Sequence, residues 1–546
     1  MTTYHSPTDP SQALKQVQNW LEQYGGTEVD VAELLCDRWA REPGRKALNY
    51  ENGFGYHEGL SYRDLEERSR RFAAALRQMG VGQGDRVAIL LPKRPALLIA
   101  AIALWRLGAV YVPLFTAFGP DAVRVRIEDA RARIVITDAA NDPKLAGIGG
   151  IHVIRVESDS DEEELGPDQG FHASIAAHDP LTENVRISGE DLMILLYTSG
   201  TTGQPKGVPI RVKALAAFEA YMRFALDVRD DDVFWNMADP GWAYGLYYGI
   251  VGPLLLGKTL LFYRAPFQAE KALDVMRRYG VTNFAAAPTA YRVMRSAGLP
   301  RPEGLQLRVA SSAGEPLNPE LFRWAKEFLD VPLFDHWGQT ELGMAIVNHH
   351  ADGLRREVKP GSMGQTMPGF RAAVLDEQGR EVSPGVEGEL ALVLADSPLC
   401  IFSEYYQAPD RTLERIDEQG QYYRTGDTAS YDEDGYYFFS GRGDDIILSA
   451  GYRIGPFEVE SALVSHPDVA EAAVVGKPDE LRGELVKAYV VLKDGKSGND
   501  DLADELSSYV KTKLAAHAYP REIVFMEALP KTPSGKVQRF LLRAES

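Results

Sequence analysis

Residues 192–208 read Leu-Met-Ile-Leu-Leu-Tyr-Thr-Ser-Gly-Thr-Thr-Gly-Gln-Pro-Lys-Gly-Val. The first five are apolar and glycines follow soon after, which is typical of a buried strand that runs into a loop. The loop combines glycines, four aliphatic hydroxyls and one lysine. Glycine lets backbone N–H groups approach an anion closely, hydroxyls donate to its oxygens, and lysine neutralises its charge. The stretch therefore predicts a polyphosphate site at the end of a buried strand.

The spacing of this loop differs from that of the common nucleotide-binding loop. The pattern Gly-x-x-x-x-Gly-Lys-Ser/Thr is absent, because Lys206 does not follow a glycine and Gly207 comes after it. This argues against an ordinary kinase or GTPase. A flexible surface linker of glycine and threonine is the alternative interpretation. We favour the phosphate site, because linkers rarely follow a buried strand or end in Pro-Lys-Gly.

Length and charge limit the class of protein. The chain has 546 residues, of which 45% are hydrophobic and 25% charged, a composition typical of a globular protein with more than one core. The formal net charge of −19 opposes binding to nucleic acid or to an anionic membrane surface, so we expect neither partner. The most apolar stretch, 96–115, carries Arg106 in its middle and predicts a buried helix, not an integral membrane span.

Cysteine usage indicates a reducing compartment. Cys36 and Cys400 are the only cysteines and lie far apart without zinc spacing, so we expect neither a disulfide framework nor structural zinc. The first twelve residues are polar and show no secretory signal. We therefore expect a cytoplasmic protein.

Helices and strands alternate through the first half of the chain. Ser61 and Asp64 resemble a helix N-cap and its partner, and the helix that they open should stop near Gly80. Such alternation predicts parallel sheets covered by helices, with ligands bound beyond the carboxyl ends of the strands. We expect strands at 86–91, 109–113, 134–137, 283–287 and 309–313, and helices at 96–107, 121–132 and 212–224.

The pattern of the sequence changes at about Gly361. Short β-like runs with frequent glycine turns follow, such as 372–375 and 388–393, and they predict a β-rich subdomain. A compact α/β pattern occupies the last part of the chain, after Asp444. The predicted fold class is α/β, with a large N-terminal domain of helix-covered sheets at 1–443 and a small C-terminal domain at 444–546.

Six motifs follow one another along the chain: residues 197–208, Gly314-Glu315-Pro316, residues 337–341, residues 423–427, residues 441–445 and residues 530–536. In this order they resemble the motifs of adenylate-forming enzymes, in particular medium-chain acyl-CoA synthetases. The resemblance covers nearly the whole chain. It implies ATP, Mg²⁺ and coenzyme A as cofactors and a small carboxylic acid as substrate. The acid would attack the α-phosphorus of ATP to give acyl-AMP and pyrophosphate, and the coenzyme A thiol would then displace AMP.

The resemblance also implies which residues bind the nucleotide. Gly314-Glu315-Pro316 would line the adenine, and Thr340 would touch the α-phosphate. Glu341 would coordinate magnesium, a hard cation that prefers oxygen. Asp427 would accept hydrogen bonds from the two ribose hydroxyls, with Arg442 nearby. The other expected nucleotide-binding residues are Thr198, Ser199, Gly200, Thr201, Thr202, Gly203 and Lys206 around the β- and γ-phosphates, together with Asp335, His336, Trp337, Gly338 and Gln339.

Lys536 is the residue expected to carry adenylation. Negative charge develops on the attacking carboxylate and the α-phosphate, and a positioned ammonium stabilises that charge more in the transition state than in the ground state. The small domain of the family is mobile and rotates between the two steps, and Asp444 matches its hinge position. Ala450 stands where many relatives carry serine, which leaves a contact open there. The residues expected to approach coenzyme A are Gly451, Tyr452 and Arg453.

The identity of the acid depends on a few small and aromatic residues. Acetyl-CoA synthetases carry a tryptophan where this chain has Gly338, and a missing indole leaves room for more carbons. Ala243 and Ala313 are small at positions that resemble pocket walls, and Trp242 and Tyr244 add aromatic surface. We expect a medium-chain, branched or aromatic acid. The preference should be broad, because one methylene changes binding by only roughly 1 to 3 kcal/mol.

Two other functions and one assembly stay open at this stage. A stand-alone adenylation enzyme would pass the acyl group to a carrier protein or another acceptor, although no carrier domain follows Ser546 in this sequence. A nucleotide-sensing protein descended from the fold would usually have lost the magnesium glutamate or the terminal lysine, and Glu341 and Lys536 are both present. A homodimer also stays open.

Overall fold

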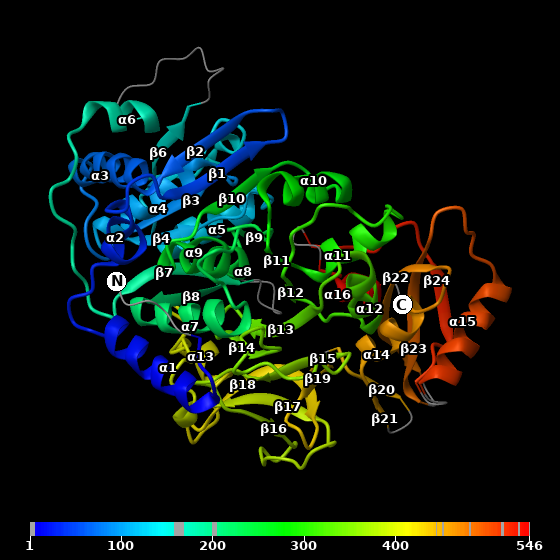
Figure 1. Ribbon diagram of the computed structural model, residues 1–546. Helices are drawn as coiled ribbons and strands as arrows, with labels where there is room; N and C mark the ends of the chain where they lie inside the picture. The colour runs from blue at the N-terminus through cyan, green and yellow to red at the C-terminus, as the bar shows by residue number, and fades with distance from the viewer. Residues whose placement is uncertain are drawn as a thin grey trace.

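The computed structural model describes residues 6–157, 169–198, 205–443, 445–449, 452–479, 482–514, 518–532 and 536–544. Within these residues the chain forms a mixed α/β fold with sheets of six, ten, three and five strands. The alternation of helices and strands predicted for the first half is confirmed. Figure 1 shows the N-terminal and central elements on the left and the elements from α14 to β24 on the right.

The six-stranded sheet is parallel except at one edge, where β8 turns back antiparallel to β7. Its strands, in spatial order, are β6 (His152–Val156), β5 (Ile134–Asp138), β3 (Arg86–Leu90), β4 (Val110–Pro113), β7 (Leu192–Thr198) and β8 (Lys206–Arg211). The stretch expected to enter the phosphate loop is β7, and nearly all of it is buried. Thr198 and Lys206 are paired residues of the β7–β8 hairpin.

The ten-stranded sheet joins a parallel half to an antiparallel half. The parallel strands are β9 (Phe234–Asn236), β11 (Asn283–Ala286), β12 (Val309–Ala313) and β13 (Leu333–Gln339). The antiparallel strands follow in the order β14 (Gly343–Val347), β15 (Ser362–Thr366), β19 (Tyr437–Arg442), β18 (Tyr422–Tyr431), β17 (Gly388–Val393) and β16 (Ala372–Leu375). The β-rich texture predicted beyond Gly361 is therefore confirmed as an extension of a mixed sheet.

The other named strands form two smaller sheets. The three-stranded sheet contains β10 (Leu260–Arg264), β1 (Lys46–Asn52) and β2 (His57–Ser61). The five-stranded sheet contains β21 (Tyr452–Ile454), β20 (Ile447–Ser449), β23 (Gly483–Leu492), β22 (Val469–Asp479) and β24 (Glu522–Phe525). The chain passes from the ten-stranded to the five-stranded sheet between Arg442 and Ile447. Asp444 is outside the described residues, and the domain boundary at that residue stays a prediction.

The helices cover the sheets, and side-chain caps start α1, α3 and α15. Ser61 and Asp64 form the predicted capping box at the start of α3. The α-helices of the N-terminal part are α1 (Pro10–Tyr24), α2 (Arg38–Ala40), α3 (Tyr62–Gln78), α4 (Pro95–Arg106), α5 (Pro120–Ala130), α6 (Phe171–Ala177), α7 (Leu215–Ala220), α8 (Ala243–Leu246), α9 (Gly252–Leu255), α10 (Ala269–Tyr279), α11 (Pro288–Ser296), α12 (Pro319–Phe328) and α13 (Pro409–Leu413). Those of the C-terminal part are α14 (Pro456–Val464), α15 (Asp500–Lys513) and α16 (Arg539–Ala544).

Short 3₁₀ and π-helical turns connect or extend several helices. The 3₁₀ turns are η2 (Asp142–Leu145), η3 (Val212–Ala214) and η6 (Leu394–Asp396), and the π-helical turns are η1 (Glu33–Asp37), η4 (Tyr221–Ala225) and η5 (Tyr247–Val251). The apolar stretch 96–115 forms the buried helix α4 followed by β4, as predicted. Among the described residues, we find no helix with both the length and the apolar character needed to cross a membrane.

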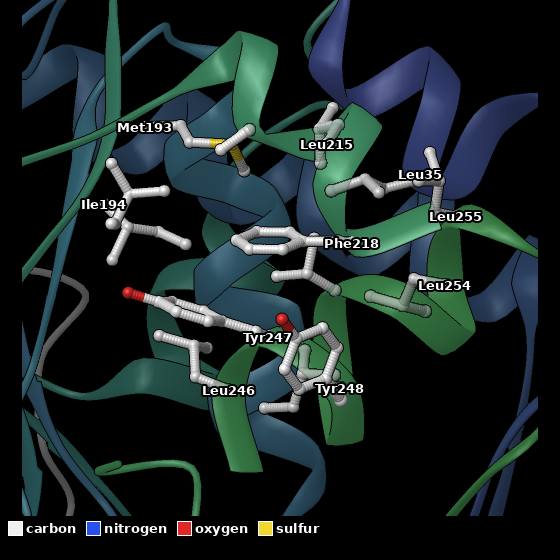
Figure 2. Packing of buried hydrophobic residues seen from close by; sticks show 14 of the residues in the cluster. Leu35, Met193, Ile194, Leu215, Phe218, Leu246, Tyr247, Tyr248, Leu254 and Leu255 are labelled. Atoms are coloured by element: carbon white, nitrogen blue, oxygen red, sulfur yellow. The ribbon is translucent and has the colours of Figure 1, made fainter. Parts of the chain in front are cut away.

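The main hydrophobic core includes residues of both the six-stranded and the ten-stranded sheets. Phe218 of α7 stacks on Tyr247 of η5 with ring centroids 4.5 Å apart, and it meets Tyr248 edge-on at 5.7 Å (Figure 2). Leu215 of α7, Leu246 of α8, and Leu254 and Leu255 of α9 belong to the same cluster and lie in the same view (Figure 2). A separate core holds the five-stranded sheet to α14 and α15. Each sheet system is therefore stabilised by its own apolar burial.

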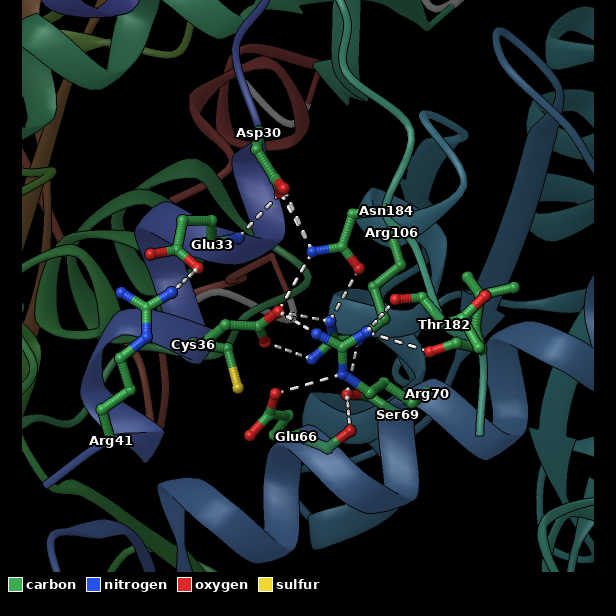
Figure 3. Close-up of polar contacts among 12 residues, drawn as sticks. Asp30, Glu33, Cys36, Arg41, Glu66, Ser69, Arg70, Arg106, Thr182 and Asn184 are labelled. Atoms are coloured by element: carbon green, nitrogen blue, oxygen red, sulfur yellow. Dashed lines mark hydrogen bonds and ion pairs between the residues drawn. The ribbon is translucent and has the colours of Figure 1, made fainter. Parts of the chain in front are cut away.

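A buried ionic network ties α4 to the N-terminal segment. The side chain of Arg106 has no exposed surface and donates to Asp37 at 2.6 and 2.9 Å and to Ser69 Oγ at 3.0 Å (Figure 3). Burial alone would raise the pKa of the Asp37 carboxyl, but hydrogen bonds and charge from Arg106 outweigh burial and hold that pKa below its ordinary value. The pair is therefore ionised in the folded protein.

Candidate active site

Two neighbouring parallel strands carry polar residues to one edge of the ten-stranded sheet. In the register of β12 and β13, Ala313 pairs with His336. Gly314-Glu315-Pro316 follows β12, and Thr340 and Glu341 follow β13. Gly314 has a φ of +99°, which L side chains rarely adopt, so this turn requires glycine. Both loops therefore lie at the carboxyl ends of neighbouring parallel strands, where ligands of such sheets bind.

The carboxylate of Asp427, on β18, contacts side chains from β13 and β19. Trp337 Nε1 and Gln339 Nε2 donate to Asp427 Oδ2 at 3.0 and 3.1 Å. Arg442 Nε lies 3.2 Å from Oδ1. Burial raises the pKa of the Asp427 carboxyl above its ordinary value, and the charge of Arg442 opposes that shift. Within the described residues Oδ1 is buried and accepts no hydrogen bond, so this oxygen is a ready acceptor for a ligand hydroxyl.

Glu341 and Lys206 meet at the ring of a buried tyrosine. The hydroxyl of Tyr405 donates to Glu341 Oε1 at 2.8 Å, and Lys206 Nζ lies 4.9 Å from the centroid of the same ring. Lys206 Nζ is also 3.7 Å from Glu414. Burial lowers the pKa of the Lys206 ammonium. A carboxylate and an ammonium, 135 residues apart in sequence (341 − 206), are thus brought to one place by β8 and the β13–β14 turn.

The residues near Glu341 fit a magnesium ion that shares its coordination with a ligand. Tyr405 donates to Oε1, and carboxylate oxygen is the donor that Mg²⁺ prefers. Among the described residues, histidine, cysteine, aspartate and glutamate form no group of three or more that could hold a metal ion. Magnesium in proteins is often bound by one or two carboxylates plus substrate phosphates, and a single glutamate suits that mode.

Two residues of α11 contact the carboxylate of Glu315. Thr289 Oγ1 donates to Glu315 Oε1 at 2.8 Å, and Arg292 forms an ion pair with the other carboxylate oxygen. Arg292 also donates to Thr289 Oγ1 at 2.8 Å. These contacts orient the loop after β12, because they anchor its only acidic side chain to the neighbouring helix.

Lys536 lies in the C-terminal part of the chain, and its electrostatic environment includes the carboxylates of Glu315, Asp427 and Glu341. Its backbone N–H donates to Thr532 Oγ1 at 3.1 Å, and its carbonyl accepts from the N–H of Thr532 at 2.7 Å. The surrounding protein lowers the pKa of the Lys536 ammonium, and the charges of Glu315, Asp427 and Glu341 oppose that shift. The side chain keeps solvent-exposed surface despite this environment. The predicted adenylation lysine and the predicted nucleotide carboxylates therefore share one electrostatic environment.

A direct hydrogen bond supports this arrangement of the two parts. Asn318 Nδ2, at the start of α12, donates to Ser461 Oγ on α14 at 3.0 Å. Figure 1 shows α12 facing α14, with α16, which follows Lys536, on the same side. In this arrangement the charges of Glu315, Asp427 and Glu341 act on Lys536.

The predicted acyl-pocket residues lie in a wall of aromatic rings. The ring of Trp242 packs against Phe115 and Phe118 with centroids 5.2 and 5.6 Å apart. Ala243 begins α8, and Tyr244 packs edge-on against Tyr248 at 5.6 Å. The hydroxyl of Tyr247 donates to the carbonyl of Thr340 at 3.1 Å, and Tyr248 accepts from the N–H of Met344 at 3.0 Å. The helix that starts at Ala243 therefore stands directly behind the turn that carries Thr340 and Glu341.

The close approach of the neighbouring backbone explains why residue 338 is a glycine, which the sequence did not reveal. A Cβ on this residue would lie 2.1 Å from the carbonyl oxygen of Gly343 and 2.8 Å from Met344 Cα. The register of β13 and β14 shifts at this point, which brings the two backbones together. Glycine is thus required by the hairpin itself. The missing side chain at position 338 does not by itself measure the depth of an acyl pocket.

Of the other predicted site residues, some lie outside the described residues and some lie within them. Ser199, Gly200, Thr201, Thr202, Gly203, Asp444 and Gly451 lie outside the described residues. Tyr452 and Arg453 belong to β21, and the Tyr452 side chain is exposed. Ala313 is buried within β12. The side chains of Asp335 and His336 are buried in β13, and the His336 ring bonds to Tyr221 and Asn348. A nucleotide contact of His336 would therefore have to come from its backbone.

Three residues of the site were not anticipated from sequence. Tyr405, Thr289 and Arg292 contact Glu341 or Glu315 from segments far along the chain. None of them belongs to a glycine-rich or charged motif. Their roles follow only from the folded positions of the strands and helices that they connect.

Comparisons with known proteins show the family of this chain. A family model described as AMP-binding enzyme matches residues 35–406, and one described as AMP-binding enzyme C-terminal domain matches residues 458–536. The chain belongs to the AMP-binding, or adenylate-forming, enzyme family. The acetyl-coenzyme A synthetase of Bacillus subtilis is 37% identical to it over 533 residues, covering 95% of this chain and 90% of that protein.

Two solved structures extend the comparison. The acyl-CoA synthetase of Brucella canis is 46% identical with a TM-score of 0.77, covering 98% of each chain. A benzoate CoA ligase from Burkholderia xenovorans is 30% identical with a TM-score of 0.83, covering 94% of this chain and 100% of that one. The protein is an ATP-dependent, AMP-forming acid–thiol ligase of the acyl-CoA synthetase type. The predicted division into a large N-terminal and a small C-terminal domain agrees with these relatives.

Proposed function

We propose that this adenylate-forming enzyme activates a medium-chain, branched or aromatic carboxylic acid through acyl-AMP and transfers the acyl group to coenzyme A. The observation that carries the adenylation site is the shared environment of Lys536, Asp427, Glu341 and Glu315. The charges of carboxylates that suit a ribose diol and a magnesium ion act on this one ammonium. This arrangement supports the first of the two chemical steps.

Each group in the site has a distinct role in binding ATP. Asp427 accepts from the ribose hydroxyls through Oδ1, which forms an ion pair with Arg442 but accepts no hydrogen bond from the described residues. The loop of Gly314-Glu315-Pro316 borders the adenine, and Thr340 donates to the α-phosphate. Lys206, with the hydroxyl-rich loop before it, neutralises the terminal phosphates. Glu341 holds magnesium, which supplies positive charge to the phosphate oxygens when bound.

Lys536 stabilises the charge that develops during adenylation. A carboxylate oxygen of the acid forms a bond to the α-phosphorus, and the bond from that phosphorus to the bridging oxygen of pyrophosphate breaks. The Lys536 ammonium lowers the energy of this transition state because negative charge accumulates on the acid and α-phosphate oxygens. In the second step the thiol sulfur attacks the acyl carbonyl carbon and AMP leaves. The proposal assigns that step to a pose in which Tyr452 and Arg453, with Gly451, approach coenzyme A about the hinge at Asp444.

The aromatic wall around Trp242 supports a substrate larger than acetate. Phe115, Phe118 and Trp242 form an apolar surface next to Ala243, and apolar surface favours hydrocarbon or aromatic acyl groups. The relatives act on acids of different size, because one is named for acetate and another for benzoate. Family membership alone therefore leaves the acid open. The choice made here rests on the residues of this wall and not on Gly338.

A panel of acids tests the proposal. Pyrophosphate release is measured with ATP, magnesium and acids from C2 to C12, including branched and aromatic ones, with and without coenzyme A. We expect turnover that depends on coenzyme A and peaks beyond propionate. A peak at acetate would refute the substrate class. Release without coenzyme A dependence would instead favour a carrier protein or another acyl acceptor.

The homodimer and the cytoplasmic location stay predictions. Sedimentation tests the first, and cell fractionation tests the second.

A further inference from the structure

A chain of buried hydrogen bonds leads from the core to the acyl side of the site. The hydroxyl oxygens of Tyr244 and Tyr221 lie 3.0 Å apart, and the Tyr221 oxygen lies 2.7 Å from His336 Nδ1. His336 Nε2 lies 2.9 Å from the backbone carbonyl oxygen of Asn348. The chain thus contains two hydroxyls and one imidazole, and it ends on a carbonyl.

The direction of every bond in this chain follows from its last member. A carbonyl oxygen can only accept, so His336 Nε2 carries the proton. Burial lowers the pKa of His336 to about 3, so the ring is neutral and its Nδ1 has no proton. Nδ1 must therefore accept from the Tyr221 hydroxyl. The Tyr221 hydroxyl donates its hydrogen bond to His336. Its oxygen therefore accepts a hydrogen bond from the Tyr244 hydroxyl.

The Tyr244 hydroxyl is consequently left with acceptor capacity alone. Its single proton points to Tyr221, while the lone pairs of its oxygen stay available. Among the described residues no side chain or backbone group donates to that oxygen. Tyr244 is 9% exposed, whereas Tyr221, Tyr247 and Tyr248 are each 0% exposed. Tyr244 is therefore the least buried member of this tyrosine cluster.

The position of Tyr244 connects this acceptor to the substrate. Asn236 Nδ2 donates to the backbone carbonyl of Tyr244 at 3.2 Å and so holds the start of α8. Gly245 allows close packing there, because a Cβ on it would lie 2.1 Å from the carbonyl oxygen of Asp239. One turn further, Tyr247 contacts the Thr340 carbonyl. Tyr244 thus begins a helical run whose next turn contacts the backbone at Thr340, and its own ring packs on Tyr221 and Tyr248.

We propose that Tyr244 is a specificity residue whose oxygen accepts a hydrogen bond from the acyl part of the substrate. The enzyme would accordingly prefer an acid that carries a hydroxyl or amino group over the same acid without it. Tyr221 and His336 are positioning residues, because they act only by fixing the direction of the Tyr244 proton. This inference rests on the proposed function, since it concerns the acid-binding part of the same site.

Matched aromatic acids test the proposal in the full-length enzyme. We would compare benzoate with its hydroxyl, amino and methoxy derivatives at each ring position, using pyrophosphate release with ATP, magnesium and coenzyme A. In the wild type at least one hydroxyl or amino isomer should exceed benzoate by about three- to tenfold in kcat/KM, as one neutral hydrogen bond allows. The methoxy isomer, which can only accept, should show no such gain.

Two substitutions separate a polar contact from simple packing. Tyr244→Phe removes the acceptor, so the advantage of the hydroxyl isomer should disappear while benzoate is still turned over. Tyr221→Phe frees the Tyr244 proton, so the preference should turn from donor-bearing acids toward the methoxy acid. A merely structural role of Tyr221 would lower the turnover of all acids alike, and thermal unfolding of each variant identifies that case.

The outcomes distinguish this inference from the proposed function. If benzoate is activated but no hydroxyl or amino isomer is preferred, the role of Tyr244 is overturned and the synthetase assignment stands. The same holds if the preference survives in Tyr244→Phe. If no acid in the panel releases pyrophosphate, the proposed function fails and this inference fails with it.

Discussion

The hydroxyl of Tyr405 donates a 2.8 Å hydrogen bond to Glu341 Oε1, and the ring of the same tyrosine lies 4.9 Å from the ammonium of Lys206. One buried side chain therefore contacts both the carboxylate proposed for magnesium and the lysine proposed for the phosphates. Neither residue is close to Tyr405 in sequence. The contact fixes the direction of the Glu341 carboxylate, because a bond to Oε1 leaves Oε2 to face a ligand.

Tyr405→Phe should weaken the use of magnesium–ATP. The substitution keeps the ring beside Lys206 but removes the donor to Glu341, and a hydrogen bond to a charged group contributes about 1.5 to 3 kcal/mol. We expect kcat/KM for ATP to fall roughly tenfold to a hundredfold, with a shift of activity toward higher magnesium concentration. Direct calorimetric titration of ATP, at several magnesium concentrations, gives a second readout that does not depend on turnover.

Tyr431→Phe is the matched control for Tyr405→Phe. Tyr431 also donates its hydroxyl to a protein oxygen, the carbonyl of Val382 at 2.8 Å, but it does so in the β-rich half of the sheet. Unchanged ATP titration is expected there. Equal losses in the two variants would contradict a special role for Tyr405.

Lys536→Ala should stop the first step and spare the second. Loss of a group that stabilises transition-state charge typically costs about a hundredfold to a thousandfold in rate. We expect that loss in acyl-AMP formation, measured by pyrophosphate release, with thioester formation from supplied acyl-AMP nearly unchanged. Lys531→Ala is the control, because Lys531 lies in the same loop but pairs with Glu471 at 2.5 Å. Equal loss of both steps in Lys536→Ala would refute the assignment.

Gly338→Trp, the substitution suggested by acetyl-CoA synthetases, would not report on the pocket alone. A Cβ at this position meets the Gly343 carbonyl at 2.1 Å, so even Gly338→Ala should disturb the β13–β14 hairpin. We expect Gly338→Ala to lower the melting temperature and the activity toward every acid. A stable Gly338→Ala enzyme with a changed chain-length profile would instead restore the pocket interpretation.

Asp37→Ala should destabilise the N-terminal domain strongly. It leaves the fully buried guanidinium of Arg106 without its main partner, and removing one member of a buried pair costs about 3 to 5 kcal/mol. Urea unfolding at neutral pH measures the loss. Glu66→Gln is the control, because Glu66 forms a partly exposed i,i+4 pair with Arg70 at 3.1 Å and should change stability by less than about 1 kcal/mol.

The same pair predicts a pH dependence. The pKa of Asp37 is lower in the folded protein than in the unfolded chain, so its contribution to stability is present above the unfolded pKa and is lost as the pH falls through the folded pKa. Acid below the ordinary aspartate range should therefore destabilise the wild type more steeply than Asp37→Asn. Parallel acid unfolding curves for the two proteins would contradict this.

Local patterns predicted much of the fold. Alternating apolar runs and caps indicated the strands near Arg86, Val110 and Ile134, and the capping box at Ser61 is present as expected. Register and strand order could not be read in this way, because they depend on which segments pair after folding. The union of parallel and antiparallel strands in one ten-stranded sheet is such a case.

The sequence by itself determined the family and proposed the site residues, because glycine loops and charged motifs are local chemistry that can be read from the linear order of Thr198, Glu341, Asp427 and Lys536. The tertiary structure decided how those residues are supported. Tyr405 orients Glu341, the β14 backbone requires Gly338, and the carbonyl of Asn348 sets the proton direction at Tyr244. These relationships join residues far apart along the chain, so only the packed sheets and helices bring them within bonding distance.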